Sequence, residues 1–216
     1  MKSIPKIRVR PANSFSPSQE GDFVLYWMIA SRRTTWNFAL DRAVEWSEKL
    51  RKPLVILEAL RCGYPWASDR MHRFVLDGMA ENACWLENTS VLYYPYVEPK
   101  PNAGKGLFAA LASRACTVVT DDFPCFFLPR MVVSAARQVP VHMEVVDSNG
   151  LLPIRQAEKS YPTAYAFRRF LQKELPPHLM EFPKVNALLH AKLPNAKPLP
   201  REIMRRWPKA SPRLLN

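Results

Sequence analysis

An uninterrupted apolar run, Phe23–Met28, restricts this sequence more than any other feature. Six apolar or aromatic residues in a row, FVLYWM, are typical of a strand that is buried on both faces. A short basic and hydroxyl-bearing loop follows, and residues with helical spacing begin near Thr35. In an open α/β sheet, ligands bind at the carboxyl ends of such strands. The loop at residues 29–35 is therefore predicted to border a binding site.

Four more strands alternate with helices along the chain. We predict strands at residues 54–60, 91–97, 117–120 and 141–146, and helices at 35–50, 69–86, 107–114 and 129–139. Thr34 or Thr35 is the expected N-cap of the first helix and Ser68 that of the second. Each connection is long enough for a crossover, so the strands should be parallel with helices on both faces. The predicted fold is α/β, a five-stranded doubly wound Rossmann-like parallel sheet of order 3-2-1-4-5.

Charge divides the chain into a neutral body and two basic flanks. Residues 21–150 hold 14 basic and 14 acidic side chains, whereas residues 1–20 carry a net +3 and residues 151–216 a net +9. We assign 1–21 to a basic arm, 22–150 to the α/β domain, and 151–216 to an interdomain helix and a Pro-rich tail. The helix is expected at 163–175, and the chain from Pro176 onward should be extended linker. The basic flanks could bind DNA phosphates or could be a solvated linker, and both interpretations stay open.

Composition and motifs exclude several classes of protein. An apolar fraction of 48% is too high for a disordered chain. No apolar run reaches the ~18 residues of a membrane span, and the N-terminus lacks the apolar core of a signal peptide. The four cysteines have no zinc or redox spacing, so we expect a cytoplasmic protein without membrane contact. Glycine-rich phosphate loops, a GxSxG elbow and metal-spaced histidines are all absent, so no catalytic residue or metal ligand is assigned.

Charged side chains follow the predicted strands at one edge of the sheet. The order 3-2-1-4-5 places residues 29–35 across a crevice from residues 121–125, so Arg32 and Arg33 should face Asp121 and Asp122. The two aspartates suit a general base or a magnesium site, but pairing with arginine and capping of the next helix is favoured. Glu58, near the end of its strand, must be paired or face the cleft, since an isolated buried charge is costly.

Aromatic side chains are also frequent near these strand ends. They are Trp27, Trp36, Tyr64, Trp66, Phe123, Phe126 and Phe127. Some would belong to the core or to a lid, and together they suit a flat, conjugated ligand. The predicted crevice residues are Trp27, Met28, Arg32, Arg33, Trp36, Asn37, Glu58, Asp121, Asp122 and Phe126.

Several short motifs resemble one known family. They are YWM at 26–28, RTTWN at 33–37 with Ala39 and Leu40, RCGY at 61–64, TDDFP at 120–124, LPR at 128–130, VDSNGLLP at 146–153 and the segment 165–175. Over residues 22–179 the pattern resembles the N-terminal antenna domain of the photolyase/cryptochrome family, with class II cyclobutane-pyrimidine-dimer photolyases as the closest match. Trp36 stands where many relatives carry aspartate, so its ring would reshape the antenna pocket.

The resemblance implies a light-harvesting domain with a deazaflavin or folate antenna chromophore. In the family, a following helical domain binds FAD and repairs DNA as a deoxyribodipyrimidine photo-lyase, a carbon–carbon lyase. We expect this chain to be a truncated or split photolyase that is inactive alone, with a flavin-binding domain as its partner. Two alternatives remain open, a stand-alone small-molecule or nucleotide-binding module and a nucleic-acid-binding protein that acts through its basic tails.

Overall fold

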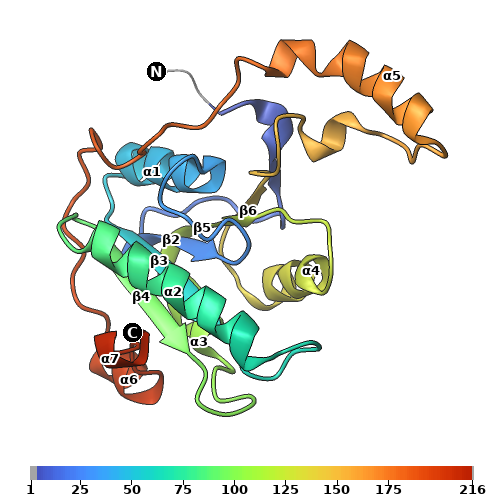
Figure 1. Ribbon diagram of the computed structural model, residues 1–216. Coiled ribbons are helices and arrows are strands. Elements are labelled where there is room, and N and C mark those ends of the chain that lie inside the picture. The colour runs from blue at the N-terminus through green and yellow to red at the C-terminus, as the bar shows by residue number, and fades with distance from the viewer. Residues whose placement is uncertain (1–3, 216) are drawn as a thin grey trace.

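The central sheet has six strands in the order β1-β6-β5-β2-β3-β4. The computed structural model in Figure 1 describes residues 4–215. Five of its strands are parallel, namely β2 (Phe23–Met28), β3 (Leu54–Leu60), β4 (Leu92–Val97), β5 (Ala115–Asp121) and β6 (Met143–Val146). Their order, β4-β3-β2-β5-β6, is the predicted 3-2-1-4-5. The doubly wound α/β fold is therefore confirmed.

The sixth strand is a short addition that the sequence analysis missed. β1 (Val9–Pro11) follows the 3-10 turn η1 (Lys6–Arg8) and pairs antiparallel with β6. Both segments belong to the stretch that we expected to be an arm outside the fold. Three residues that include a proline carry no alternating pattern, and a proline is tolerated here because β1 is an edge strand.

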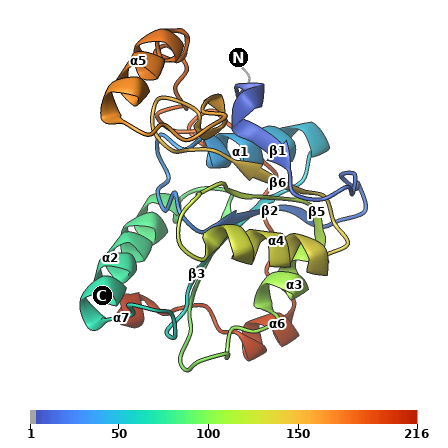
Figure 2. The ribbon, with the colours of Figure 1, turned by 90° about the vertical axis from the view of Figure 1, so that its right-hand side faces the viewer.

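Two layers of helices cover the sheet. α1 (Phe38–Leu50) and α2 (Asp69–Leu86) pack on one face, and α3 (Leu107–Ala112) and α4 (Leu128–Gln138) pack on the other (Figure 2). Successive strand residues point to opposite faces. Tyr26 and Met28 consequently join the core under α1, while Leu25 and Trp27 join the core under α3 and α4.

The start of α1 differs from the prediction, while that of α2 agrees with it. Asn37, not Thr34 or Thr35, is the N-cap of α1, and its side-chain oxygen accepts the N–H groups of Ala39 and Leu40. Thr35 instead forms an isolated bridge to Asn186 in the C-terminal part of the chain, which delays the helix. The Ser68 side chain caps α2 as predicted.

The C-terminal part of the chain packs against the body and is not a free linker. It contains η3 (Pro176–His178), α6 (Arg201–Arg206) and α7 (Pro212–Leu215). The N–H groups of Ala196 and Ala210 donate to carbonyls of Ser90 and Pro95 beside the outer strand β4. The tail thus covers an edge that would otherwise expose unpaired backbone groups. The linker prediction was wrong because such contacts depend on a distant strand and leave no local period.

No helix within residues 4–215 is both long and apolar enough to cross a membrane.

One buried carboxylate fastens the tail to α1. The Lys184 N–H donates to Asp41 Oδ2 at 2.9 Å, while Asp41 Oδ1 is buried without a hydrogen-bond partner among the described residues. Burial raises the pKa of Asp41 to about 6, although the hydrogen bond from Lys184 acts in the opposite direction. The folded protein therefore holds a proton on Asp41 at pH values where the unfolded chain has lost it.

Asp41→Asn should accordingly change how stability depends on pH. Because the pKa of Asp41 is raised on folding, its contribution to stability is complete below the unfolded pKa and is lost as pH rises through about 6. The variant should be more stable than wild type by roughly 2–3 kcal/mol near pH 8, with the advantage vanishing near pH 4. Urea unfolding across this range measures the difference. Glu48→Gln on the same helix serves as the control, and an Asp41→Asn advantage that does not vary with pH would contradict the assignment.

Candidate functional site

Asp121, at the end of β5, organises the loop that follows β2. Its Oδ2 accepts the backbone N–H groups of Ile29, Ala30 and Ser31 at 2.8–3.0 Å, and its Oδ1 accepts the Tyr26 hydroxyl at 2.8 Å. Burial raises the pKa of Asp121, while these donors favour the ionised form. The carboxylate is thus fully occupied in holding residues 29–31 at the end of β5.

The two arginines of that loop do not face the aspartates, contrary to expectation. Arg32 Nη1 lies 3.1 Å from Glu58 Oε1, and its Nη2 donates to the Ala59 carbonyl. Arg33 instead donates to the carbonyl of Trp36. The backbone of the loop, not its side chains, contacts Asp121. The arginine side chains therefore point toward β3 and the start of α1.

Glu58 is buried and paired, as the sequence analysis required. Besides Arg32, the Tyr93 hydroxyl and the Asn82 amide donate to its Oε2 at 2.6 and 2.9 Å. The proximity of Glu58 contributes to a raised pKa of Tyr93, for which burial is the larger cause. Every oxygen of Glu58 has a partner, so this cluster is a satisfied part of the core.

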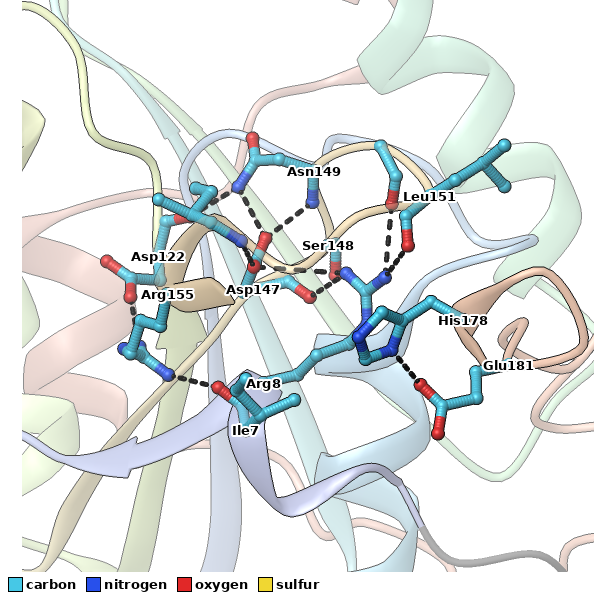
Figure 3. A network of polar contacts seen from close by, with 12 residues as sticks. Ile7, Arg8, Asp122, Asp147, Ser148, Asn149, Leu151, Arg155, His178 and Glu181 are labelled. Atoms are coloured by element: carbon cyan, nitrogen blue, oxygen red, sulfur yellow. Dashed lines mark hydrogen bonds and ion pairs between the residues drawn. The ribbon is translucent and has the colours of Figure 1, made fainter. Parts of the chain in front are cut away.

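A second polar network fixes the chain after β6 (Figure 3). The Arg8 guanidinium donates to the carbonyls of Asp147, Gly150 and Leu151, and its Nη1 lies 3.8 Å from Asp147 Oδ2. Asp147 in turn accepts the N–H groups of Asn149 and Ile154. Both members of this ion pair have fully buried side chains.

Asp122 belongs to the same network and faces away from Arg32 and Arg33. Arg155, in the 3-10 turn η2 (Ile154–Gln156), donates to Asp122 Oδ2 and to the Ile7 carbonyl. Arg10 on β1 lies 3.6 Å from the same carboxylate. The network therefore joins residues 7–10 to residues 147–155 and sets the direction in which the chain leaves the sheet.

That departing chain forms a helix that contacts neighbouring turns, where the Gln156 amide donates to Glu174 at 2.9 Å, and leaves much of its apolar surface exposed. α5 (Ala164–Glu174) begins at the predicted N-cap Thr163, and none of its residues is buried. Figure 1 shows it projecting from the body beside the 3-10 turns. Phe167 and Phe170 of α5 gather with Tyr161 at centroid distances of 4.7–6.1 Å.

The open cavity lies on the other face of the sheet, under α3 and α4. It measures about 640 Å³ and is bounded by the ends of β3 and β4, the loop 98–106, α3 and one face of α4 along its whole length. Its apolar lining includes Trp27, Leu57, Tyr96, Leu107, Phe108 and Met131. Trp27 and Phe108 meet at a centroid distance of 4.2 Å with their planes inclined at 31°. Such a volume with aromatic walls fits a flat ligand of small-molecule size.

Two polar groups in the lining have no hydrogen bond within the described residues. The side chains of Trp27 and Tyr96 are only 7% and 3% exposed, but the indole N–H and the phenol hydroxyl are not among the fully buried polar atoms. Both groups can therefore reach solvent in the cavity and are available to a ligand. Arg61, Lys105 and Arg130 also line the cavity and form no ion pair in residues 4–215. The arrangement favours a planar ligand with an acceptor for these two donors and a negative charge near the rim.

Glu98 holds two walls of the cavity together. Its Oε2 accepts the Cys62 N–H at 3.1 Å, and its Oε1 accepts the Gly104 N–H at 3.0 Å. Burial alone would raise the pKa of Glu98, but these N–H donors lower it overall. The carboxylate thereby connects the loop after β3 to the loop after β4.

Aromatic side chains close over one end of the cavity. Tyr64 lies 6.4 Å from Phe127 between ring centroids, and both residues line the cavity. Outside them, Trp66 and Phe126 meet at 6.1 Å and remain 76% and 72% exposed. Both have positive φ angles, 69° and 59°, an uncommon conformation for bulky residues. These residues form an exposed aromatic rim.

The structure separates the predicted site residues into three places. Trp27 lines the cavity and Phe126 lies on its rim. The rest lie under α1 and α2 or at the network after β6, and they are Met28, Arg32, Arg33, Trp36, Asn37, Glu58, Asp121 and Asp122. Trp36 is 44% exposed beside Phe182, so its ring does not enter the cavity. Whether any of these residues binds a ligand stays a prediction.

Sequence reasoning overlooked most of the cavity lining. Tyr96, Phe108 and Glu98 were not singled out, and the loop around Lys105 was treated as a simple turn. Alternation along β2 was the available signal, since Trp27 and Met28 must point to opposite faces. Within residues 4–215 no three His, Cys, Asp or Glu side chains gather to hold a metal ion.

Comparison with known proteins supplies an independent observation. No family model matches the chain. The curated deoxyribodipyrimidine photo-lyase of Methanothermobacter thermautotrophicus is 28% identical over 169 residues, which cover 78% of this chain and 37% of that protein. The chain is similar to photolyases. The Arabidopsis thaliana deoxyribodipyrimidine photo-lyase is 24% identical over 185 residues, or 83% of this chain and 37% of the relative. The photolyase-like chain thus spans little more than a third of these relatives.

Two solved structures with partial likeness are universal stress proteins. The one from Archaeoglobus fulgidus in complex with dAMP has a TM-score of 0.38 and 13% identity, covering 58% of this chain and 96% of that chain. A universal stress protein in complex with cAMP has a TM-score of 0.37 and 15% identity, covering 60% of this chain and 99% of its own.

Proposed function

We propose that this photolyase-related chain is the light-harvesting domain of a class II-like DNA-repair photolyase system and acts with a flavin-binding partner. The observation that carries the proposal is the similarity to a curated photo-lyase across 78% of the chain. These residues match 37% of that relative, and we propose that FAD and the carbon–carbon lyase step belong to a flavin-binding domain that corresponds to the unmatched part. The chain alone would then collect light without repairing DNA, in the cytoplasm.

The cavity under α3 and α4 is the proposed chromophore site. A deazaflavin or a folate has a planar conjugated ring system that would lie against the adjoining rings of Trp27 and Phe108. Its ring carbonyls or ring nitrogens would accept from the unpartnered Trp27 and Tyr96 donors. An acidic substituent would extend toward Arg61, Lys105 or Arg130 at the rim. In this function the residues orient and desolvate the chromophore and take part in no bond-making step.

The proposed partner contact is α5 with its aromatic cluster. An amphipathic helix that buries nothing exposes apolar surface of the kind that partner proteins cover. Arg168, Arg169 and Lys173 add positive charge to this element, so an acidic surface on the flavin-binding domain would complement it. The basic flanks are proposed to contact DNA phosphates when the assembled system binds its substrate.

The absorption spectrum of the purified chain, after incubation with 5-deazariboflavin, tetrahydrofolate or FAD and removal of unbound ligand, tests this function. We expect a retained antenna band in the near-ultraviolet or visible region for one of the first two compounds. Retention of FAD with its oxidised-flavin peaks would contradict the assignment of FAD to a partner. Retention of none of the three would contradict the light-harvesting role.

A further inference from the structure

We propose that the C-terminal segment, residues 199–207, supports one wall of the ligand cavity and that Trp207 is the residue that positions this wall. The inference rests on the proposed function, since it concerns the same cavity. The sequence places this segment about a hundred residues away from the loop 98–106 that it supports. Figure 2 shows α6 beside α3, on the face of the sheet that holds the cavity.

Trp207 touches the cavity wall directly from behind. Its indole N–H donates to the Ala103 carbonyl at 3.0 Å. A Cβ atom added at Gly106 would lie 3.2 Å from Cζ2 of the Trp207 ring, so the ring packs against the backbone there. Gly106 has a φ of 93°, a conformation that side chains rarely adopt, and it lines the cavity. Trp207 and the glycine therefore fit together as one unit.

The position of Trp207 is itself fixed from several sides. The Tyr94 hydroxyl donates to the Trp207 carbonyl at 2.5 Å, and the backbone N–H of Trp207 donates to the Ile203 carbonyl at 2.9 Å. The Arg206 guanidinium lies 4.5 Å from the centre of its ring. Leu199, Ile203 and Trp207 are all buried in the core that contains Trp27 and Leu107. Trp207 is thus bonded both to Tyr94 on β4 and to Ala103 in the loop 98–106, so it fixes the loop relative to the sheet.

The loop between β4 and α3 depends on two supports. Glu98 holds Gly104 from the side of the loop after β3, and Trp207 holds Ala103 and Gly106 from the opposite side. Gly104, Lys105 and Gly106 all contribute to the cavity lining. Loss of the Trp207 support would let this stretch move away from Trp27 and Phe108 and widen the cavity. A flat ligand would then lose contact on one side and bind less tightly.

The test uses the full chain and compares Trp207→Ala with wild type. The dissociation constant for 5-deazariboflavin, measured by fluorescence titration, should rise by about tenfold. Amide hydrogen exchange at Gly104, Lys105 and Leu107 should accelerate, whereas exchange in β2 and α1 should stay at the wild-type rate. An unfolded variant would lose protection everywhere, so the local pattern separates positioning from general instability.

Milder variants keep the test decisive if Trp207→Ala fails to fold. Tyr94→Phe removes only the hydroxyl that donates to the Trp207 carbonyl, and Trp207→Phe removes the N–H that donates to Ala103. Both should raise the dissociation constant and the local exchange in the same direction, by smaller factors. Met204→Ala, at a partly exposed position on the same helix, is the matched control and should change neither quantity.

The outcomes separate this inference from the proposed function. Wild-type affinity and wild-type exchange in the Trp207 and Tyr94 variants would overturn the positioning role. If the wild type binds no probe, the light-harvesting proposal fails, and the exchange rates of residues 104–107 still decide whether Trp207 supports the wall.

Discussion

Arg8→Ala should lower the free energy of unfolding by about 3–5 kcal/mol, because it leaves the buried Asp147 carboxylate without its counter-ion. Arg8 also donates to the carbonyls of Gly150 and Leu151, which would lose these partners in the same interior. The expected loss is a large share of the total stability of a domain of this size. Urea unfolding followed by circular dichroism measures it.

The neighbouring Arg10 offers a matched control. Its side chain is 46% exposed and lies 3.6 Å from Asp122, so the pair is screened by solvent. Arg10→Ala should cost less than about 1 kcal/mol. Hydrogen exchange should also show residues 149–156 losing protection in Arg8→Ala alone. Equal costs for the two variants would show that the Arg8 network does not anchor the chain after β6.

Asp121→Ala should be the second strongly destabilising change, costing about 4 kcal/mol. The substitution leaves the N–H groups of residues 29–31 and the Tyr26 hydroxyl without their acceptor, and each such group costs about 1–3 kcal/mol when it is buried. The same unfolding measurement applies.

Asp122→Ala is the control for this prediction, since the two aspartates are adjacent in the sequence and were expected to act together. The Asp122 carboxylate is partly exposed and pairs with arginines, so its removal should cost about 1 kcal/mol. A larger loss for Asp122→Ala than for Asp121→Ala would contradict the assignment of Asp121 as the carboxylate that holds the loop.

The strand order was predictable because it depends on local and general rules. The long apolar strands β2, β3 and β5 carry a strong signal, and crossover connections leave few arrangements of parallel strands. The second helix and its Ser68 cap were predictable for the same reason, since a cap and a period lie within a few residues of each other. β1 was not predictable, because a three-residue edge strand owes its existence to pairing with β6.

The binding site was harder to predict than the fold. We expected Arg32 and Arg33 to face Asp121 and Asp122, but Asp121 instead accepts the backbone N–H groups of residues 29–31. These contacts are long-range in sequence, and no local pattern predicts them. The cavity under α3 and α4 likewise depends on long-range contacts, because Trp207 and Glu98 hold the loop 98–106 that forms one of its walls.

The packed tail changes how the basic C-terminal part is understood. A free linker would contribute only charge, whereas α6 and α7 contribute Ile203 and Leu215 to buried clusters. α5, in contrast, has no buried residue, and it carries the aromatic cluster proposed to contact a partner. Because α6 and α7 are packed on the body and α5 is exposed, we place the proposed partner contact at residues 161–174.

Titration of the chain with 5-deazariboflavin, comparing cavity variants with a crevice variant, tests the central claim most directly. Ala109→Trp and Ser134→Trp each place a ring in the cavity from a different helix, and Arg32→Ala removes a side chain from the predicted crevice under α2. We predict that both tryptophan variants weaken binding by about a hundredfold or more, while Arg32→Ala binds within about threefold of wild type. Undiminished binding in the tryptophan variants, or loss of binding in Arg32→Ala alone, would contradict the account.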